Sequence, residues 1–121
     1  GPTADDRPGT IEDALAGTRA MLAFYVGGMG AKGQNYHTRL AARMGLGEQP
    51  ERIQDLFLEG RGDEAAFEVP VEFADEISLV GTPARIANRV AAWKESAVTE
   101  ILVAAGSVYQ VRQAAEIILP V

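Results

Sequence analysis

The chain has 121 residues, which is enough for one domain with a modest core. Hydrophobic residues make up 47% of it, a larger share than is typical of a disordered chain. Its net charge of −6 disfavours nucleic acid as a partner, because proteins that bind nucleic acid usually present a basic face. The absence of cysteine excludes disulfides, thiol catalysis and iron–sulfur clusters, and no apolar run is long enough to span a membrane, so we expect a cytoplasmic protein.

The first nine residues are expected to be a tag scar followed by a flexible lead-in. Gly1-Pro2 resembles the remnant that a protease leaves when it removes an expression tag. Residues 3 to 9 are polar and contain Pro8, which disfavours regular structure before position 10.

Residues 10 to 76 are predicted to be a helical segment. Thr10 is expected to cap its first helix, in which Ile11 and Leu15 begin an apolar pattern at helical spacing. The end of that pattern, Met21 to Val26, is apolar all round, so a buried strand is an alternative there.

Glycine-rich stretches divide the rest of this segment into shorter helices. Asn35 is a plausible cap for a helix that runs to Met44. Pro50 opens the next helix, at a position where the missing N–H of proline costs nothing. Shorter helical turns are expected after Asp63 and after Pro70.

Residues 77 to 121 are predicted to form a closing βαβα unit, whose elements occupy positions 77 to 119. The strands are expected at Ile77–Val80 and Glu100–Ala104, and Thr82-Pro83 is a strong signal for the start of the helix between them. Two parallel strands leave their outer edges unpaired. We therefore expect the partner of this unit to be the remainder of a larger sheet or barrel, or a second copy in a homo-oligomer.

Four residues follow the carboxyl ends of the two predicted strands and are candidates for cofactor binding: Gly81, Thr82, Gly106 and Ser107. Ligands of α/β sheets and barrels bind beyond these strand ends, and the free N–H groups at a helix start attract phosphate and other anions. Ordinary helix caps would explain the same residues.

No residue is assigned to catalysis or to a metal. Residues 28 to 33 match the pattern G-x-G-x-x-G, but the segment before them is predicted to be a helix, whereas a dinucleotide-binding loop follows a strand. His37 is the one histidine, and nothing at useful spacing supplies the nucleophile and carboxylate of a hydrolase triad or the further ligands of a zinc site. We interpret His37 as a residue on a helix surface.

The order of several motifs resembles that of the luciferase-like monooxygenases. Val80–Pro83, Ile86–Val90 and Val98–Val103 are similar to the closing βαβα unit of this family, whose members use flavin or deazaflavin coenzymes on a TIM barrel. Further segments resemble its deazaflavin-dependent branch in actinobacteria: Tyr25–Gly30, Asn35-Tyr36, Leu40-Ala41, Arg43–Gly45, Ile53–Leu56 and Asp63–Ala66.

The resemblance implies an α/β fold, namely the helix-rich C-terminal part, roughly the last third, of a TIM (β/α)8 barrel. It implies a segment of an oxidoreductase or monooxygenase that depends on coenzyme F420 or FMN. The main catalytic positions of the family lie on earlier strands, so we expect the chain alone to be inactive and to bind no coenzyme. The alternative is a shortened, non-catalytic relative that self-associates and serves as a binding or assembly module.

Overall fold

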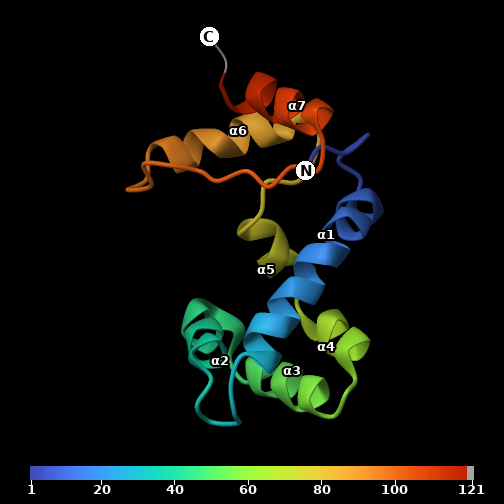
Figure 1. The fold of residues 1–121 in the computed structure, drawn as a ribbon, viewed down its shortest axis with the longest axis vertical. Coiled ribbons are helices and arrows are strands. Elements are labelled where there is room, and N and C mark those ends of the chain that lie inside the picture. Colours follow the sequence, from blue (N-terminus) through green and yellow to red (C-terminus); the bar gives the residue numbers. More distant parts are fainter. Residues whose placement is uncertain (120–121) are drawn as a thin grey trace. The chain divides into compact units, whose positions relative to one another are not determined.

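The computed structural model describes residues 1–119, which form helices joined by turns and loops (Figure 1). The chain divides into two compact units. Unit 1 comprises Gly1–Ile11 together with the chain from Leu79 onward, and unit 2 comprises Glu12–Ser78. No helix among the described residues is long and apolar enough to cross a bilayer.

Unit 2 is built from short helices and two π-helical turns. In chain order these are α1 (Pro8–Ala23, which begins in unit 1), η1 (Phe24–Gly28), α2 (Tyr36–Ala41), η2 (Ala42–Leu46), α3 (Gln49–Leu58), α4 (Gly62–Glu68) and α5 (Val71–Glu76). Helix α3 packs against η1, α2, η2 and α4 and is the centre of the unit. Its inner side buries Ile53 and Leu56.

The buried side chain of Asn35 joins the start of α2 to the π-helical turn η1. Asn35 is buried, and its side-chain oxygen accepts hydrogen bonds from the backbone N–H groups of His37 (2.8 Å) and Thr38 (3.4 Å), which makes it the N-cap of α2. Its Nδ2 and the Thr38 hydroxyl both donate to the carbonyl oxygen of Val26, each at 2.7 Å. The predicted cap at Asn35 is therefore confirmed, and the same side chain also ties α2 to the end of η1.

A buried arginine holds the segment after α4 against α1. The Nε of Arg19 donates to the carbonyl oxygen of Val69 (2.9 Å), and its Nη2 donates to that of Phe67 (2.6 Å). Its guanidinium also lies 5.1 Å from the centre of the Phe67 ring, and Glu12 pairs with it at 3.2 Å. Two carbonyl groups at the end of α4 thus depend on one side chain of α1.

The predicted helices of residues 10 to 76 agree with the structure in kind and differ at some ends. The first helix begins at Pro8 rather than Thr10, so Thr10 is not its cap. Its apolar end continues as η1, which removes the alternative of a strand at Met21 to Val26. Pro50 lies in the first turn of α3, as expected.

Unit 1 contains α6 (Pro83–Lys94) and α7 (Val108–Ile118), which pack on each other. The N-terminal residues, expected to be a lead-in, pair with the segment before α6: the Thr3 N–H donates to the Gly81 carbonyl (2.8 Å), and the Gly1 ammonium donates to that of Leu79 (2.8 Å). Pro2 and Gly81 form an isolated parallel bridge.

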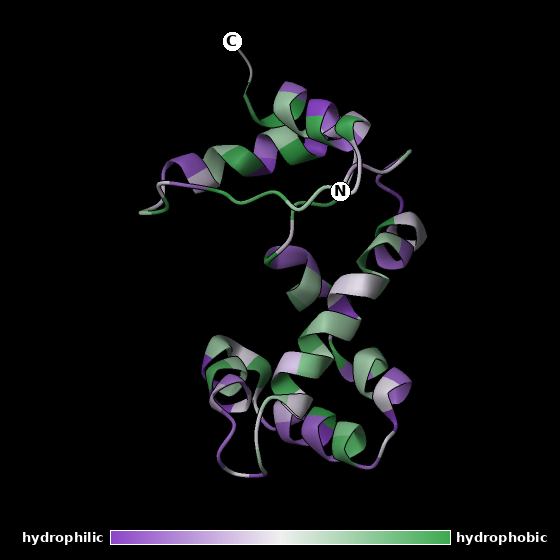
Figure 2. Cartoon of the chain, viewed as in Figure 1, coloured by the Kyte–Doolittle hydropathy of each residue, from purple (hydrophilic) through white to green (hydrophobic). Residues whose placement is uncertain are grey.

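The two predicted strands are corrected by the structure, because neither Ile77–Val80 nor Glu100–Ala104 is a strand among the described residues. A strand exists only through hydrogen bonds to a neighbouring strand, and within residues 1–119 these two segments do not pair. The apolar sequence of the second segment is exposed instead: Leu102 is 97% exposed, and the stretch between α6 and α7 is coloured as hydrophobic over much of its length (Figure 2).

Candidate functional site

The start of α6 contains two of the candidate residues, Gly81 and Thr82. Thr82 is the N-cap, and its hydroxyl oxygen accepts a hydrogen bond from the Arg85 N–H at 3.3 Å. Gly81 has a φ of +136°, and a Cβ there would lie 2.5 Å from the Arg85 side chain. Arg85 in turn donates to the carbonyl oxygen of Val80. The turn therefore requires glycine, and Thr82 faces the first N–H groups of α6.

The side-chain carboxylate of Asp6 lies at the start of α6. The Asp6 carboxylate accepts hydrogen bonds from the Thr82 N–H (2.7 Å) and from the Thr82 hydroxyl (2.8 Å). A negative charge at a helix N-terminus is favourable because the N–H groups there have no helical partner. Asp6 was not predicted to contribute, because no local pattern links two residues that lie 76 positions apart.

The start of α7 contains the other two candidates, Gly106 and Ser107. The Ser107 hydroxyl oxygen accepts from the Gln110 N–H at 3.3 Å, and the Gln110 side-chain oxygen accepts from the Gly106 N–H at 2.6 Å. This reciprocal arrangement is a variant of the capping box. Both residues are exposed, and their contacts are those of helix caps; coenzyme binding by them stays a prediction.

A cavity of about 480 Å³ lies in unit 1 between the first residue of α6 and one side of α7. Its lining is Pro83, Tyr109, Arg112, Gln113, Glu116 and Ile117. None of the four candidate residues contributes to it. The cavity presents one cation, one carboxylate and a phenol, so it differs in chemistry from the backbone donor site that the sequence predicts.

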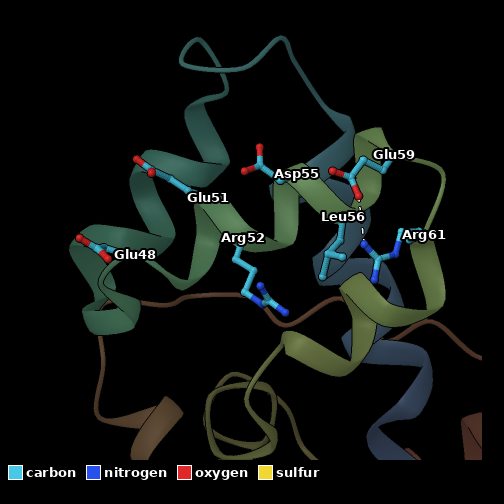
Figure 3. Close-up of a pocket in the computed structure, with 7 residues that line it drawn as sticks. All are labelled: Glu48, Glu51, Arg52, Asp55, Leu56, Glu59 and Arg61. Atoms are coloured by element: carbon cyan, nitrogen blue, oxygen red, sulfur yellow. Dashed lines mark hydrogen bonds and ion pairs between the residues drawn. The ribbon is translucent and has the colours of Figure 1, made fainter.

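A second cavity, of about 380 Å³, lies in unit 2 along α3 (Figure 3). Its lining is Glu48, Glu51, Arg52, Asp55, Leu56, Glu59 and Arg61. No group of three or more His, Asp or Glu side chains among residues 1–119 is arranged to hold a metal ion.

Ion pairs use several of the charges around this second cavity. Arg61 pairs with Glu59 at 3.1 Å and with Glu64 at 2.5 Å, and it lowers the pKa of the Glu64 carboxyl. Lys32 pairs with Asp55 at 2.7 Å, and this hydrogen bond raises the pKa of the Lys32 ammonium. The groove is therefore a charged surface whose cations are largely committed to their neighbours.

The remaining sequence motifs have structural surroundings that do not favour catalysis. Residues 28 to 33 begin at the last residue of the π-helical turn η1 and do not follow a strand, so the arrangement of a dinucleotide-binding loop is absent there. The His37 ring is half-buried and makes edge contacts with Tyr25 and Tyr36, with ring centres 5.2 Å and 5.6 Å apart. His37 is thus part of an aromatic cluster on the surface of unit 2.

Comparison with known proteins identifies a relative for nearly the whole chain. Over 105 residues the chain is 39% identical to a protein of Mycobacterium tuberculosis (strain ATCC 25618 / H37Rv) that carries the provisional name coenzyme F420-dependent oxidoreductase Rv3520c. The aligned part is 87% of this chain but 30% of the relative, so the chain spans less than one third of that protein's length. No family model matches the chain. No solved structure matches it either. The chain is therefore a homologue of one part of a larger protein named as an oxidoreductase.

Proposed function

We propose that this chain serves as part of a coenzyme F420-dependent oxidoreductase. The observation that carries the proposal is the 39% identity to the Mycobacterium tuberculosis relative, which extends over 87% of the chain. The motifs that resemble the deazaflavin-dependent branch of the luciferase-like monooxygenases lie within the same chain and agree with that relative's name. In this proposal, the rest of a longer protein supplies the main catalytic residues.

The proposed architecture is the closing part of a TIM barrel. Two features support it: each predicted strand segment is followed by a capped helix, α6 or α7, and the apolar residues of Glu100–Ala104 stay exposed within this chain, Ile101 by 39%, Leu102 by 97% and Val103 by 47%. An apolar run of this kind is typical of a barrel strand that is covered on both faces. Neighbouring strands would supply the strand-to-strand hydrogen bonds that Ile77–Val80 and Glu100–Ala104 do not make among the described residues.

Three observations support our proposal that the chain alone does not bind the coenzyme. The donors of Thr82 are both engaged by Asp6, and those at Gly106 and Ser107 belong to a capped turn. No candidate residue lines the cavity beside α7. We therefore assign no catalytic step to these residues, and we propose that coenzyme binding requires the longer protein.

A chimera tests this proposal. The aligned segment of the Mycobacterium tuberculosis relative is replaced by the matching residues of this chain, and binding of coenzyme F420 is followed by its fluorescence. We expect the chimera to bind F420 within about ten-fold of the affinity of the unmodified relative, because a compatible segment restores the same barrel. The chain alone is expected to show no binding at micromolar concentrations.

Three results would contradict the proposal or a part of it. The first is a chimera that is folded by circular dichroism and elutes like the unmodified relative but does not bind F420. The second is micromolar binding of F420 by the isolated chain, which would mean that the rest of the protein is not needed. A chimera that binds FMN in place of F420 would overturn the choice of coenzyme.

A further inference from the structure

The charges of unit 2 are divided into two blocks along the sequence. Residues 14 to 47 contain no aspartate or glutamate, although the chain has 17 such residues, and they carry the cations Arg19, Lys32, Arg39 and Arg43. Residues 48 to 76 carry ten acidic side chains and two basic ones. Both blocks belong to unit 2, so one compact body has a basic part and a strongly acidic part.

The basic block also exposes apolar side chains on α2 and η2. Tyr36, Leu40 and Met44 follow one another at intervals of four residues, so they lie on one side of the helical path. All three are exposed, Tyr36 by 60% and Met44 by 52%. Arg39 and Arg43 each precede one of these residues. We call these five residues the α2–η2 face.

Aromatic contacts extend this face without a break. The Tyr36 ring contacts His37, which contacts Tyr25, and Tyr25 contacts Phe24 with ring centres 5.7 Å apart. The Phe24 ring lies 6.0 Å from that of Phe57 on α3. These contacts limit the movement of the rings, so the aromatic part of the surface would lose little side-chain entropy when a partner binds.

The charges best placed to meet a partner are those not used within the chain. Arg19 is buried and Lys32 is paired with Asp55, whereas Arg39 and Arg43 make no ion pair with any described residue. Glu48 and Glu51 at the start of α3 likewise make no ion pair with any described residue, and both lie on one side of that helix in Figure 3.

We propose that the α2–η2 face binds the start of α3 in a second copy of this chain. Because η2 and α3 are consecutive and packed together, the basic face and the acidic pair adjoin. A two-fold axis between two such patches places Arg39 and Arg43 of each copy opposite Glu48 and Glu51 of the other. The exposed tyrosine, leucine and methionine then supply the apolar centre of the interface.

A second copy explains this surface better than a membrane or a nucleic acid. A nucleic acid and a membrane rich in anionic lipids are both negatively charged, and the acidic block of residues 48 to 76 next to the basic face would repel either of them. Only a partner with acidic and basic regions of its own complements both halves at once. The inference rests on unit 2 alone and does not depend on the proposed coenzyme.

Analytical ultracentrifugation of the chain and its charge-reversal variants tests the inference. The expected species is a dimer in about 50 mM salt, weakened by about ten-fold or more in about 500 mM salt, where surface charges are screened. The double variants R39E/R43E and E48R/E51R should each weaken the dimer by about ten-fold or more. Mixing the two variants should restore association, because each then meets the opposite charge. Circular dichroism reports whether each variant is folded.

A charge-matched control is K94E/R112E, which makes the same change in net charge in unit 1 and should leave the dimer unchanged. The inference is wrong if the chain is monomeric at about 100 µM, or if the control weakens the dimer as much as R39E/R43E. It is equally wrong if the two mixed variants do not associate while each remains folded. Binding to phosphatidylglycerol vesicles that is lost in R39E/R43E, with no dimer at any salt concentration, would assign the face to a membrane instead.

Discussion

Arg19 shows how one buried cation can hold the end of α4 against α1. It donates to the carbonyl groups of Phe67 and Val69, and each would lose its partner if the guanidinium were removed. We expect Arg19→Met to lower the free energy of unfolding by about 3 kcal/mol, since the methionine fills similar space but leaves two carbonyl groups without donors. Urea denaturation of the purified variant measures this change.

The control for Arg19→Met is Arg39→Met, which removes an exposed arginine that makes no ion pair with a described residue. It should change the free energy of unfolding by less than about 0.5 kcal/mol at protein concentrations where the chain is monomeric. Equal losses in the two variants would contradict the role given to the buried guanidinium.

The carboxyl of Glu64 provides a prediction about pH. Arg61 donates a hydrogen bond to it and lowers its pKa below the ordinary value of 4.5. A carboxyl whose pKa is lower in the folded state binds fewer protons there than in the unfolded state. The contribution of this carboxyl to the free energy of unfolding is therefore fully present above pH 4.5, and it is lost as the pH falls through the lowered pKa. NMR titration should show this pKa returning toward 4.5 in Arg61→Gln, and an unchanged pKa would contradict the assigned cause.

At the scale of elements, a close approach between η1 and α3 depends on glycine. A Cβ at Gly27 would lie 2.5 Å from the Cβ of Phe57 and 3.2 Å from the carbonyl oxygen of Ile53. We expect Gly27→Ala to lower the free energy of unfolding by about 2 kcal/mol, because η1 and α3 must separate to admit the methyl group. Thermal unfolding followed by circular dichroism measures the change.

The matched variant is Gly17→Ala in α1, where a Cβ would meet nothing within 4 Å. There the same substitution should raise the free energy of unfolding by about 0.5–1 kcal/mol, because alanine loses less backbone entropy than glycine in a helix. The two glycines thus predict effects of opposite sign. A stabilising Gly27→Ala would mean that η1 and α3 do not pack as described.

The sequence predicted helices better than strands, and the reason is the range over which each is determined. Asn35, Thr82 and Ser107 cap helices through N–H groups two or three residues away, so the signal and its effect lie together in the sequence. A strand at Glu100–Ala104 requires a partner from elsewhere. Its β-branched, apolar residues indicate a suitable side-chain environment but cannot supply that partner.

The same distinction applies to the candidate site. The sequence located the two helix starts at Gly81-Thr82 and Gly106-Ser107, because turn glycines and caps are local features. It could not identify the carboxylate of Asp6 as the group that meets Thr82, since that contact depends on how the N-terminal residues pair with Leu79 and Gly81.

At the scale of the whole molecule, burial is unevenly distributed. Most of the fully buried apolar side chains belong to unit 2, among them Leu15, Ile53, Ala65 and Val69. In unit 1, none of the described residues of α7 is buried, and the segment before that helix is exposed throughout. The helix α7 and the segment before it should therefore unfold locally more easily than unit 2, because stability against local unfolding depends on the apolar surface that each element buries.

Hydrogen exchange provides a test of this difference. In the isolated chain, the backbone amides of α7 should exchange at least about ten-fold faster than those of α3, which lies at the centre of unit 2. In the chimera described above, neighbouring strands should cover Glu100–Ala104 and the inner side of α7, so the amides of both segments should become protected, while those of α3 change little. Equal protection of α7 and α3 in the isolated chain would contradict the inference from burial. If α7 is equally protected in the isolated chain and in the chimera, the exposed segment Glu100–Ala104 is not covered by neighbouring strands. That result would remove the structural support for the barrel.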